Sequence, residues 1–320
     1  MTTALTRPRH RLPASAVLGT DIAAATNVDE ALQLASLGWG IQVRDAGSFT
    51  VMTKDGVTST SMPGQRFLMR SDNQVTLAAV GSRYEPIDNR AAFGLADHAR
   101  QMGATFAHAG ESDHGRKVFL TMDLPGARVH VGGKDIVDFG VVFWAHHGSG
   151  SVSGSVTGKR LICMNGATIG IGVPIKWTIL HTASAHDRLV LAETSLKGAT
   201  RYAKEFAAVG EMLISTPFTE NQFGVYIDRL YPRPDEGKKS ALTRWETRRS
   251  ELFELFRTAE TQADSRDTQW AAFNAVTEWE DWFRSTRGSD GAEQARAARQ
   301  FTNADSAGVK QYAYETLLAA

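Results

Sequence analysis

Hydrophobic and polar residues follow two different periods along this chain, and the period changes near residue 185. Before that point, short apolar runs are separated by turns rich in Gly, Asn and Asp, which is typical of β-strands joined as hairpins. After it, apolar residues recur every three or four positions, which indicates amphipathic helices. The pattern therefore predicts an α+β fold: an N-terminal and central, mostly antiparallel sheet of hairpins with one or two packed helices, followed by a helical C-terminal part.

The strand signals are strongest where an apolar run meets a turn-forming pair. Asp55-Gly56 is a typical hairpin turn, and the segment 136–144 is too continuously apolar to be half exposed. A Ser/Gly hairpin is expected to end at Lys159 and Arg160. The predicted strands cover residues 39–44, 49–53, 56–62, 67–70, 75–80, 105–111, 116–124, 134–146, 152–157, 160–164 and 175–181.

The helix signals include recognisable N-terminal caps. Asn27 followed by Glu30 resembles a capping box, and Asp88 or Asn89 is placed to cap the next helix. The predicted helices cover residues 28–37, 89–102, 187–212, 222–230, 240–258, 268–284, 291–301 and 306–318. We accordingly expect a mobile arm at 1–18, a strand-rich core domain at 19–185, and a helical part at 186–320 that mediates self-association.

Composition excludes several classes of protein. The 320 residues carry 35 Lys+Arg and 35 Asp+Glu, so no global field draws the chain to nucleic acid or membrane, and any such contact must come from a local patch. The single cysteine, Cys163, excludes a disulfide framework and a cysteine-based zinc site. No apolar run is long enough to span a bilayer, and no signal-peptide pattern precedes the first strand. These features predict a cytoplasmic protein.

Residues 139–186 contain no Asp or Glu, although the chain as a whole is charge-balanced. The segment carries Lys159, Arg160, Lys176 and four histidines among many Ser, Thr and Gly residues. Such a composition favours a surface that meets an anion, or a sheet core with a polar rim.

Catalytic motifs fail in this segment at defining positions. A phosphate-binding loop needs Gly five residues before Gly158 and a hydroxyl residue after Lys159, but Ser153 and Arg160 stand there. A nucleophile elbow needs Ser between its two glycines, but Val152 occupies that position. No histidine spacing supports a metal site. The sequence thus predicts no catalytic residue, no metal and no other cofactor.

Basic residues near aromatic side chains, without competing carboxylates, suit a sugar-phosphate backbone with stacked bases. The candidate nucleic-acid-binding residues fall into three groups. The cations for phosphate are Lys159, Arg160 and Lys176, extended by Arg116 and Lys117; the stacking residues are Trp144 and Trp177; and the further donors are His146 and His147.

The series Phe143-Trp144-Ala145-His146-His147-Gly148-Ser149, Arg160-Leu161-Ile162-Cys163-Met164-Asn165-Gly166 and His181-Thr182 resembles a phage/plasmid-like family of unknown function. Further similarities, such as Gly19 and Gly110, extend the resemblance over most of the chain. His147 stands where that family usually has aspartate. The resemblance implies a protein encoded by mobile DNA. The predicted order of strands and helices is also similar to that of single-strand annealing proteins of phage recombination, which is an analogy of fold alone.

We therefore expect a phage-type single-stranded-DNA-binding, strand-annealing recombination protein that forms a homo-oligomer and has no membrane partner. One alternative is a non-enzymatic assembly or inhibitor protein of a mobile element, which would pair Lys159 and Arg160 with remote carboxylates. A third is a metal-dependent nuclease or hydrolase, in which Asp113, Asp123, Asp135 and Asp138 would have to cluster across strands.

Overall fold

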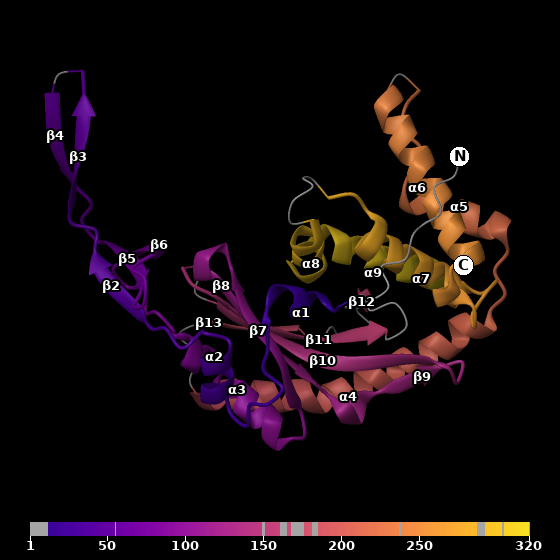
Figure 1. Ribbon diagram of the computed structural model, residues 1–320, viewed down its shortest axis with the longest axis horizontal. Coiled ribbons are helices and arrows are strands. Elements are labelled where there is room, and N and C mark those ends of the chain that lie inside the picture. Colours follow the sequence, from indigo (N-terminus) through magenta and orange to yellow (C-terminus); the bar gives the residue numbers. More distant parts are fainter. Residues whose placement is uncertain are drawn as a thin grey trace.

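Antiparallel sheets dominate the first half of the molecule and helices the second, so the predicted α+β class is confirmed (Figure 1). This computed structural model describes residues 12–54, 56–148, 151–160, 165–167, 176–180, 185–236, 238–286, 292–302 and 304–319.

The strands form one large sheet and two small ones. They are β1 (Thr20–Asp21), β2 (Ile41–Asp45), β3 (Ser48–Thr53), β4 (Gly56–Ser61), β5 (Gln65–Arg70), β6 (Thr76–Gly81), β7 (Thr105–Ser112), β8 (Lys117–Asp123), β9 (Val129–Val131), β10 (Asp135–His146), β11 (Ser151–Arg160), β12 (Asn165–Ala167) and β13 (Lys176–Leu180). The large sheet has the order β1-β7-β8-β10-β11-β12, with β9 paired to β10 and β13 paired to β11. Strands β2, β5 and β6 form a second sheet, and β3 pairs with β4.

Helices cover both faces of the large sheet. They are α1 (Ala14–Leu18), α2 (Val28–Leu34), α3 (Asn89–Gln101), α4 (Ala185–Ser215), α5 (Glu220–Leu230), α6 (Lys239–Thr258), α7 (Gln269–Glu278), α8 (Ala292–Thr302) and α9 (Ala304–Leu318), with short turns η1 (Asp113–Gly115), η2 (Pro125–Ala127) and η3 (Glu260–Gln262) and a π-helical turn η4 (Trp279–Phe283). The long helix α4 runs beneath the sheet, whereas α8 and α9 lie above it (Figure 1).

The core is continuous across residue 185. Phe139 of β10 is fully buried, and its ring meets the rings of Tyr202 and Phe206 from α4 at centroid distances of 5.6 and 5.4 Å. Phe206 in turn contacts Trp270 of α7. Aromatic packing thus joins the sheet to the helices that follow it.

Two differences from the prediction bear on the large sheet. Residues 14–18, expected in a mobile arm, instead form α1, which packs against β7 and α8; residues 1–11 lie outside the described part of the chain. The expected break between residues 157 and 160 is absent, because β11 continues from Ser151 to Arg160 and pairs with β10 along its whole length.

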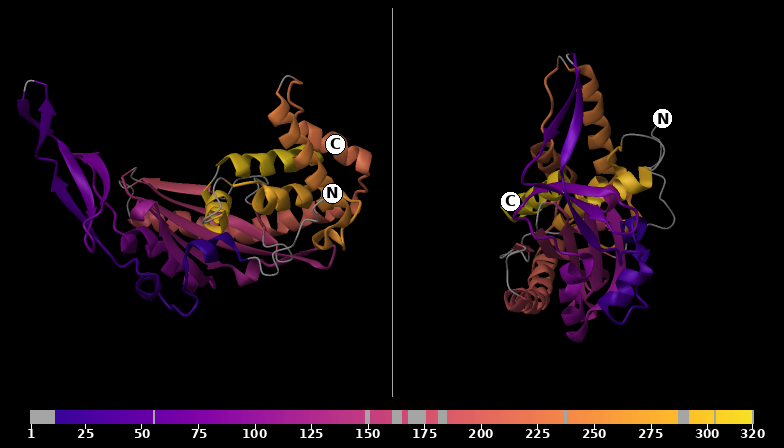
Figure 2. Two further views of the ribbon diagram at one scale, coloured as in Figure 1. Left: turned by 45° about the horizontal axis from the view of Figure 1, so that its top comes forward. Right: turned by 90° about the vertical axis from the view of Figure 1, so that its left-hand side faces the viewer.

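The β3–β4 hairpin stands clear of the rest of the molecule (Figures 1 and 2). Met52 and Val57 are cross-strand partners in it, and they are 85% and 66% exposed. No described residue of β3 or β4 belongs to the buried core. We call this β3–β4 hairpin the arm; it is a different segment from the N-terminal residues 1–18.

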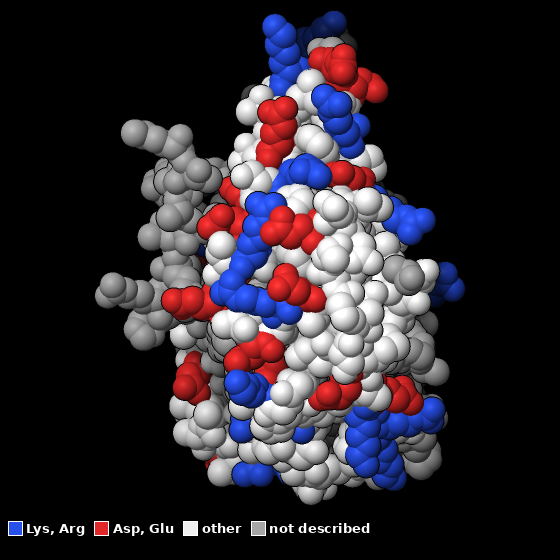
Figure 3. All heavy atoms as spheres, turned by 90° about the vertical axis from the view of Figure 1, so that its right-hand side faces the viewer, with Lys and Arg blue, Asp and Glu red and all other residues white. Residues whose placement is uncertain are grey.

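No described helix has the length and apolar character needed to cross a membrane. On the face shown in Figure 3, Lys and Arg side chains are interspersed with Asp and Glu. Ion pairs also link α6 to α5, Arg257 with Glu220 and Arg249 with Asp228.

Candidate nucleic-acid interface

Strand β11 separates its polar and apolar side chains cleanly between the two faces of the sheet. Ser151, Ser153, Ser155, Thr157 and Lys159 are half-buried, whereas each residue between them, and Arg160 at the end, is buried. This follows from the strand period of two, which sends successive side chains to opposite faces. The result is a row of four hydroxyls and one ammonium along one face, which we call the hydroxyl row.

A pocket of about 160 Å³ lies over the Lys159 end of the hydroxyl row. Its floor comes from β7, β8, β10 and β11, and its roof from α1, α8 and α9. The polar side chains that line it are those of Ser15, His108, Thr121, Asp123, Asp138, Ser155, Thr157, Lys159, Gln300 and Lys310. Trp144 and Phe301 add aromatic surface.

Charges in the pocket are paired to different degrees. Asp138 accepts two hydrogen bonds from Arg128, at 2.5 Å from Nε and 3.0 Å from Nη2. Lys159 Nζ, by contrast, stands 3.9 Å from Asp123 Oδ1, which is longer than a hydrogen bond. Lys159 and Asp123 therefore keep hydrogen-bonding capacity toward a ligand.

His108 enters the pocket from a β-bulge. The register of β7 against β8 shifts between Phe106 and Ala109, and bulges of this kind re-aim side chains. Thr121 Oγ1 secures the bulge, because it accepts a hydrogen bond from His108 N and donates one to His108 O. The ring Nδ1 lies 3.2 Å from Ser15 Oγ on α1.

Both histidines on this face have lowered pKa values. Burial lowers the pKa of His108; Asp21 and Asp123 oppose this effect and Lys159 adds to it. Burial also lowers the pKa of His146, and the neighbouring Lys117 contributes further. Both rings are therefore neutral at pH 7, and neither supplies a full positive charge for a phosphate.

These histidines make the fold sensitive to mild acid. Because their folded pKa values lie below the unfolded value of about 6.5, the stability they contribute is complete above that pH and is lost as pH falls through the folded values. Urea unfolding measured between pH 8 and 5.5 should show a declining free energy of unfolding. Replacing both His108 and His146 with Gln should flatten that decline; an unchanged decline would contradict the assignment.

Arg160 does not reach this face, which corrects its expected role in phosphate binding. Its side chain is 6% exposed, and Nε donates to Asp135 Oδ2 at 2.5 Å. Nη2 also donates to the carbonyl of Thr261 in η3 at 2.7 Å. As the residue after Lys159 on a continuous strand, Arg160 points to the opposite face and into the core.

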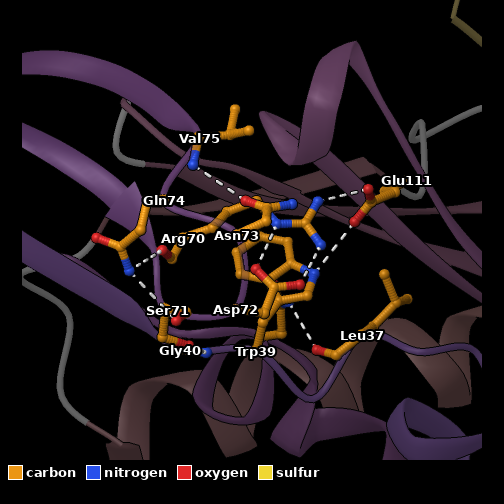
Figure 4. A network of polar contacts seen from close by, with 11 residues as sticks. Leu37, Trp39, Gly40, Arg70, Ser71, Asp72, Asn73, Gln74, Val75 and Glu111 are labelled. Atoms are coloured by element: carbon orange, nitrogen blue, oxygen red, sulfur yellow. Dashed lines mark hydrogen bonds and ion pairs between the residues drawn. The ribbon is translucent and has the colours of Figure 1, made fainter.

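His147 is likewise buried and does not serve as a surface donor. A hydrogen bond of 2.9 Å joins its Nε2 to Asn89 Oδ1, and its ring meets that of Trp39 edge-on. Trp39 belongs to a polar joint between the small and large sheets, where the Arg70 guanidinium lies over its ring and pairs with Asp72 and Glu111 (Figure 4). His147 thus supports the joint between the β2–β5–β6 sheet and the large sheet.

Trp144, His146 and Lys117 do lie together. Lys117 of β8, His146 of β10 and Ser151 of β11 are cross-strand partners in one line. Trp144 is two residues from His146 on the same face, opposite Ser153, and its ring contacts those of Phe119 and Phe301. Trp144 is therefore partly covered by α8 and does not present an open stacking surface.

Of the remaining predicted residues, the structure describes the side chain of Arg116 but not those of Lys176 and Trp177. Arg116 is exposed beside Lys117, 3.8 Å from the carboxylate of Asp113. Strand β13 pairs Lys176 with Ser155 and Trp177 with Gly154, but the side chains of Lys176 and Trp177 lie outside the described residues.

Sequence reasoning did not single out His108 or the four hydroxyls of the row, and it named Asp123 only as one of the carboxylates that a nuclease would need. The alternation in Ser-Val-Ser-Gly-Ser-Val-Thr-Gly-Lys-Arg carried the signal for the hydroxyls, because small polar and buried residues alternate with period two. Nothing local marks Ser15 or His108, which meet only through the packing of α1 on β7.

Within the described ranges, no group of three or more His, Cys, Asp or Glu side chains is arranged to hold a metal ion. No curated protein and no solved structure matches the chain. A family model does match residues 76–301, which include β7, β8, β10, β11 and α4. The match covers more than half of the chain, and the protein therefore belongs to the family described as a domain of unknown function, DUF932.

Proposed function

We propose that this protein binds single-stranded DNA along the hydroxyl row, with Lys117 at one end and Lys159 at the other. The observation that carries the proposal is the row itself: five polar side chains at alternate positions of one strand, all half-buried on one face. Hydroxyl and ammonium groups are the usual donors to phosphate oxygens. Alternate strand residues repeat every 6.6 Å or so, which suits a polymer with regularly repeated acceptors.

Two further predicted residues lie beside the row. Trp144 lines the pocket next to Ser155 and Thr157, but its ring packs against Phe301 of α8, so base stacking on it is not part of the proposal. Arg116 extends the cationic end at Lys117. Arg160 and His147 are left out of this interface because both are buried.

Strand annealing, self-association and a phage origin are further parts of the proposal. They rest on the resemblance to phage annealing proteins, and the helical part supplies surface for contacts between copies. A cytoplasmic location fits the single cysteine, Cys163. An annealing assay with labelled complementary strands, with native mass measured alongside, tests these parts directly.

The binding test uses fluorescence anisotropy of a labelled single strand at several salt concentrations. Lys117→Ala combined with Lys159→Ala is expected to weaken binding and to lower the log–log salt slope by about 0.7 for each lost contact. Both lysines are on the proposed face, and neither has a buried ion pair to lose.

The matched control is Lys204→Ala, an exposed lysine on α4, which lies on the other side of the sheet. It should retain the wild-type affinity and slope. If the double variant also retained both, the hydroxyl row would not be the DNA-binding surface.

A second candidate function is protein assembly without nucleic acid. The exposed cross-strand pair Met52 and Val57 on the arm favours it, because paired apolar side chains at an isolated site suit contact with another protein. The buried pairing of Arg160 with Asp135 also agrees with this candidate. Absence of any DNA binding at low salt would leave assembly as the preferred function.

A further inference from the structure

Helix α8 lies over the large sheet (Figure 1) and covers part of the hydroxyl-row face with one aromatic side chain. The ring of Phe301 lies 4.8 Å from the ring of Trp144 and 4.8 Å from that of Phe119, measured between centroids. Trp144 and Phe119 are cross-strand partners on β10 and β8, and their rings are 5.4 Å apart. The sheet thus supplies two neighbouring rings, which we call the aromatic pair, and Phe301 packs against both.

The roof over the Lys159 end of the row leaves too little room for a nucleotide. The pocket there has a volume of about 160 Å³, whereas sites for ligands of drug size, the size of a nucleotide, occupy roughly 300–1,000 Å³. Ser155 and Lys159 line that pocket together with Phe301 of α8. A DNA strand that follows the whole row must therefore displace part of the roof.

Helix α8 is held in the roof less firmly than α9. Among the described residues of α8, only Ala297 belongs to the buried core. Its polar anchors lead to η4 and not to the sheet, because Gln300 Nε2 donates to the carbonyl of Asp281 at 2.9 Å and Arg299 Nη2 donates to that of Glu280 at 3.0 Å. Helix α9, by contrast, places Lys310 in an ion pair with Asp281 in which the side chains are 5% and 0% exposed. Of these two helices, α8 is the one that a bound strand displaces more easily.

We infer that the aromatic pair is a base-binding site, which Phe301 occupies until a single strand displaces it. This inference rests on the proposed DNA-binding function and deepens it. A phenylalanine ring and a nucleobase both have a flat aromatic face, so a base can take the place of Phe301 on Trp144 without leaving the tryptophan ring bare in water. The site accepts any base, because every base has a face that stacks on an aromatic side chain. Phe301 acts as a built-in competitor, and the apparent affinity for DNA is reduced to the extent that it fills the site.

The test compares Phe301→Ala with the wild-type protein by fluorescence anisotropy, using a labelled single strand and the duplex of the same sequence. Removal of the competitor is expected to tighten binding of the single strand by about fivefold or more, the size of effect that stacking of one base supplies. Affinity for the duplex should stay the same, because its bases are already stacked on one another. The gain should vanish when Phe301→Ala is combined with Trp144→Ala.

The matched control is Phe253→Ala, which removes a half-buried phenylalanine of α6 that packs on Phe223, away from the sheet. It should keep the wild-type affinity, and thermal unfolding would verify that the variants are folded. A second measurement leaves α8 unchanged: addition of a single strand to the wild-type protein should quench tryptophan fluorescence. Trp144→Phe should lose most of that quenching while it keeps most of the affinity.

A single-strand affinity of Phe301→Ala equal to that of the wild type would overturn the inference and leave DNA binding along the row intact. A gain that persists in the variant without Trp144, or that extends to the duplex, would do the same. Should Phe301→Ala not fold, equal quenching in the wild type and in Trp144→Phe would overturn the inference by itself. Failure of the wild type and of folded Phe301→Ala to bind a single strand at low salt would overturn the proposed function, and the base-binding site with it.

Discussion

Replacing Arg160 with alanine is expected to lower the free energy of unfolding by about 3–5 kcal/mol, because it leaves a buried carboxylate without its counter-charge. The side chains of Arg160 and Asp135 are 6% and 5% exposed. Trp270 of α7 donates to the same carboxylate oxygen at 2.7 Å, and Arg160 also bonds to Thr261. One substitution would thus remove the side-chain links of β11 to Asp135 of β10 and to Thr261 of η3 together.

Urea unfolding followed by circular dichroism measures this effect, with Lys159→Ala as the control. Lys159 precedes Arg160 on the same strand but faces the pocket, and its replacement should change stability by no more than about 0.5 kcal/mol. Changing Arg160 to Met and Asp135 to Leu together should recover most of the loss, because an apolar pair needs no counter-charge. Equal stability of the two alanine variants would show that Arg160 is not buried as described.

Replacing Phe139 with alanine is expected to cost about 3–5 kcal/mol, the usual range for a large aromatic side chain removed from a packed core. Its ring is almost fully buried between β10 and α4, where it meets Tyr202 and Phe206. The resulting cavity would open between the sheet and the helix, at the layer boundary that joins the two halves of the chain.

This variant also tests whether the halves unfold together. A shared core predicts one cooperative transition, shifted to lower urea concentration, by both circular dichroism and tryptophan fluorescence. Met52→Ala on the arm is the control, since that side chain is 85% exposed, and it should leave the midpoint unchanged. Two separated transitions would mean that the sheet and the helices are independent units.

Local chemistry was enough to predict the fold class and several element boundaries. Asn27 accepts a hydrogen bond from Glu30 N at the start of α2, and Asp88 accepts one from Ala91 N at the start of α3. Thr219 forms a full capping box with Gln222. These capping hydrogen bonds span only three residues, so the sequence alone predicts them without knowledge of the tertiary structure.

Gly158 shows why the turn at the end of β11 was predicted wrongly. A glycine followed by two basic residues favours a turn, but Gly158 lies inside strand β11. A Cβ atom at that position would come within 3.1 Å of the Phe139 ring. The glycine therefore serves close packing against an aromatic neighbour, and only the pairing of β10 with β11 reveals that neighbour.

The sequence predicted Lys159, Lys117, Arg116, His146 and Trp144, which lie along one face of the sheet, but it misplaced Arg160 and His147. Arg160 looks like a surface cation because its partners, Asp135 and Thr261, lie 25 and 101 residues away. The pocket likewise depends on α1 and α8 closing over the sheet from opposite ends of the chain. Such contacts are set by tertiary packing, which no local pattern encodes.

The isolation of the arm has a practical consequence. Because no described side chain of β3 or β4 belongs to the buried core, added residues at their connection would not disturb the packing of the body. A fluorophore or an affinity tag inserted between the two strands would therefore report on the intact molecule. It would also sit far enough from the large sheet to leave the pocket open to ligands.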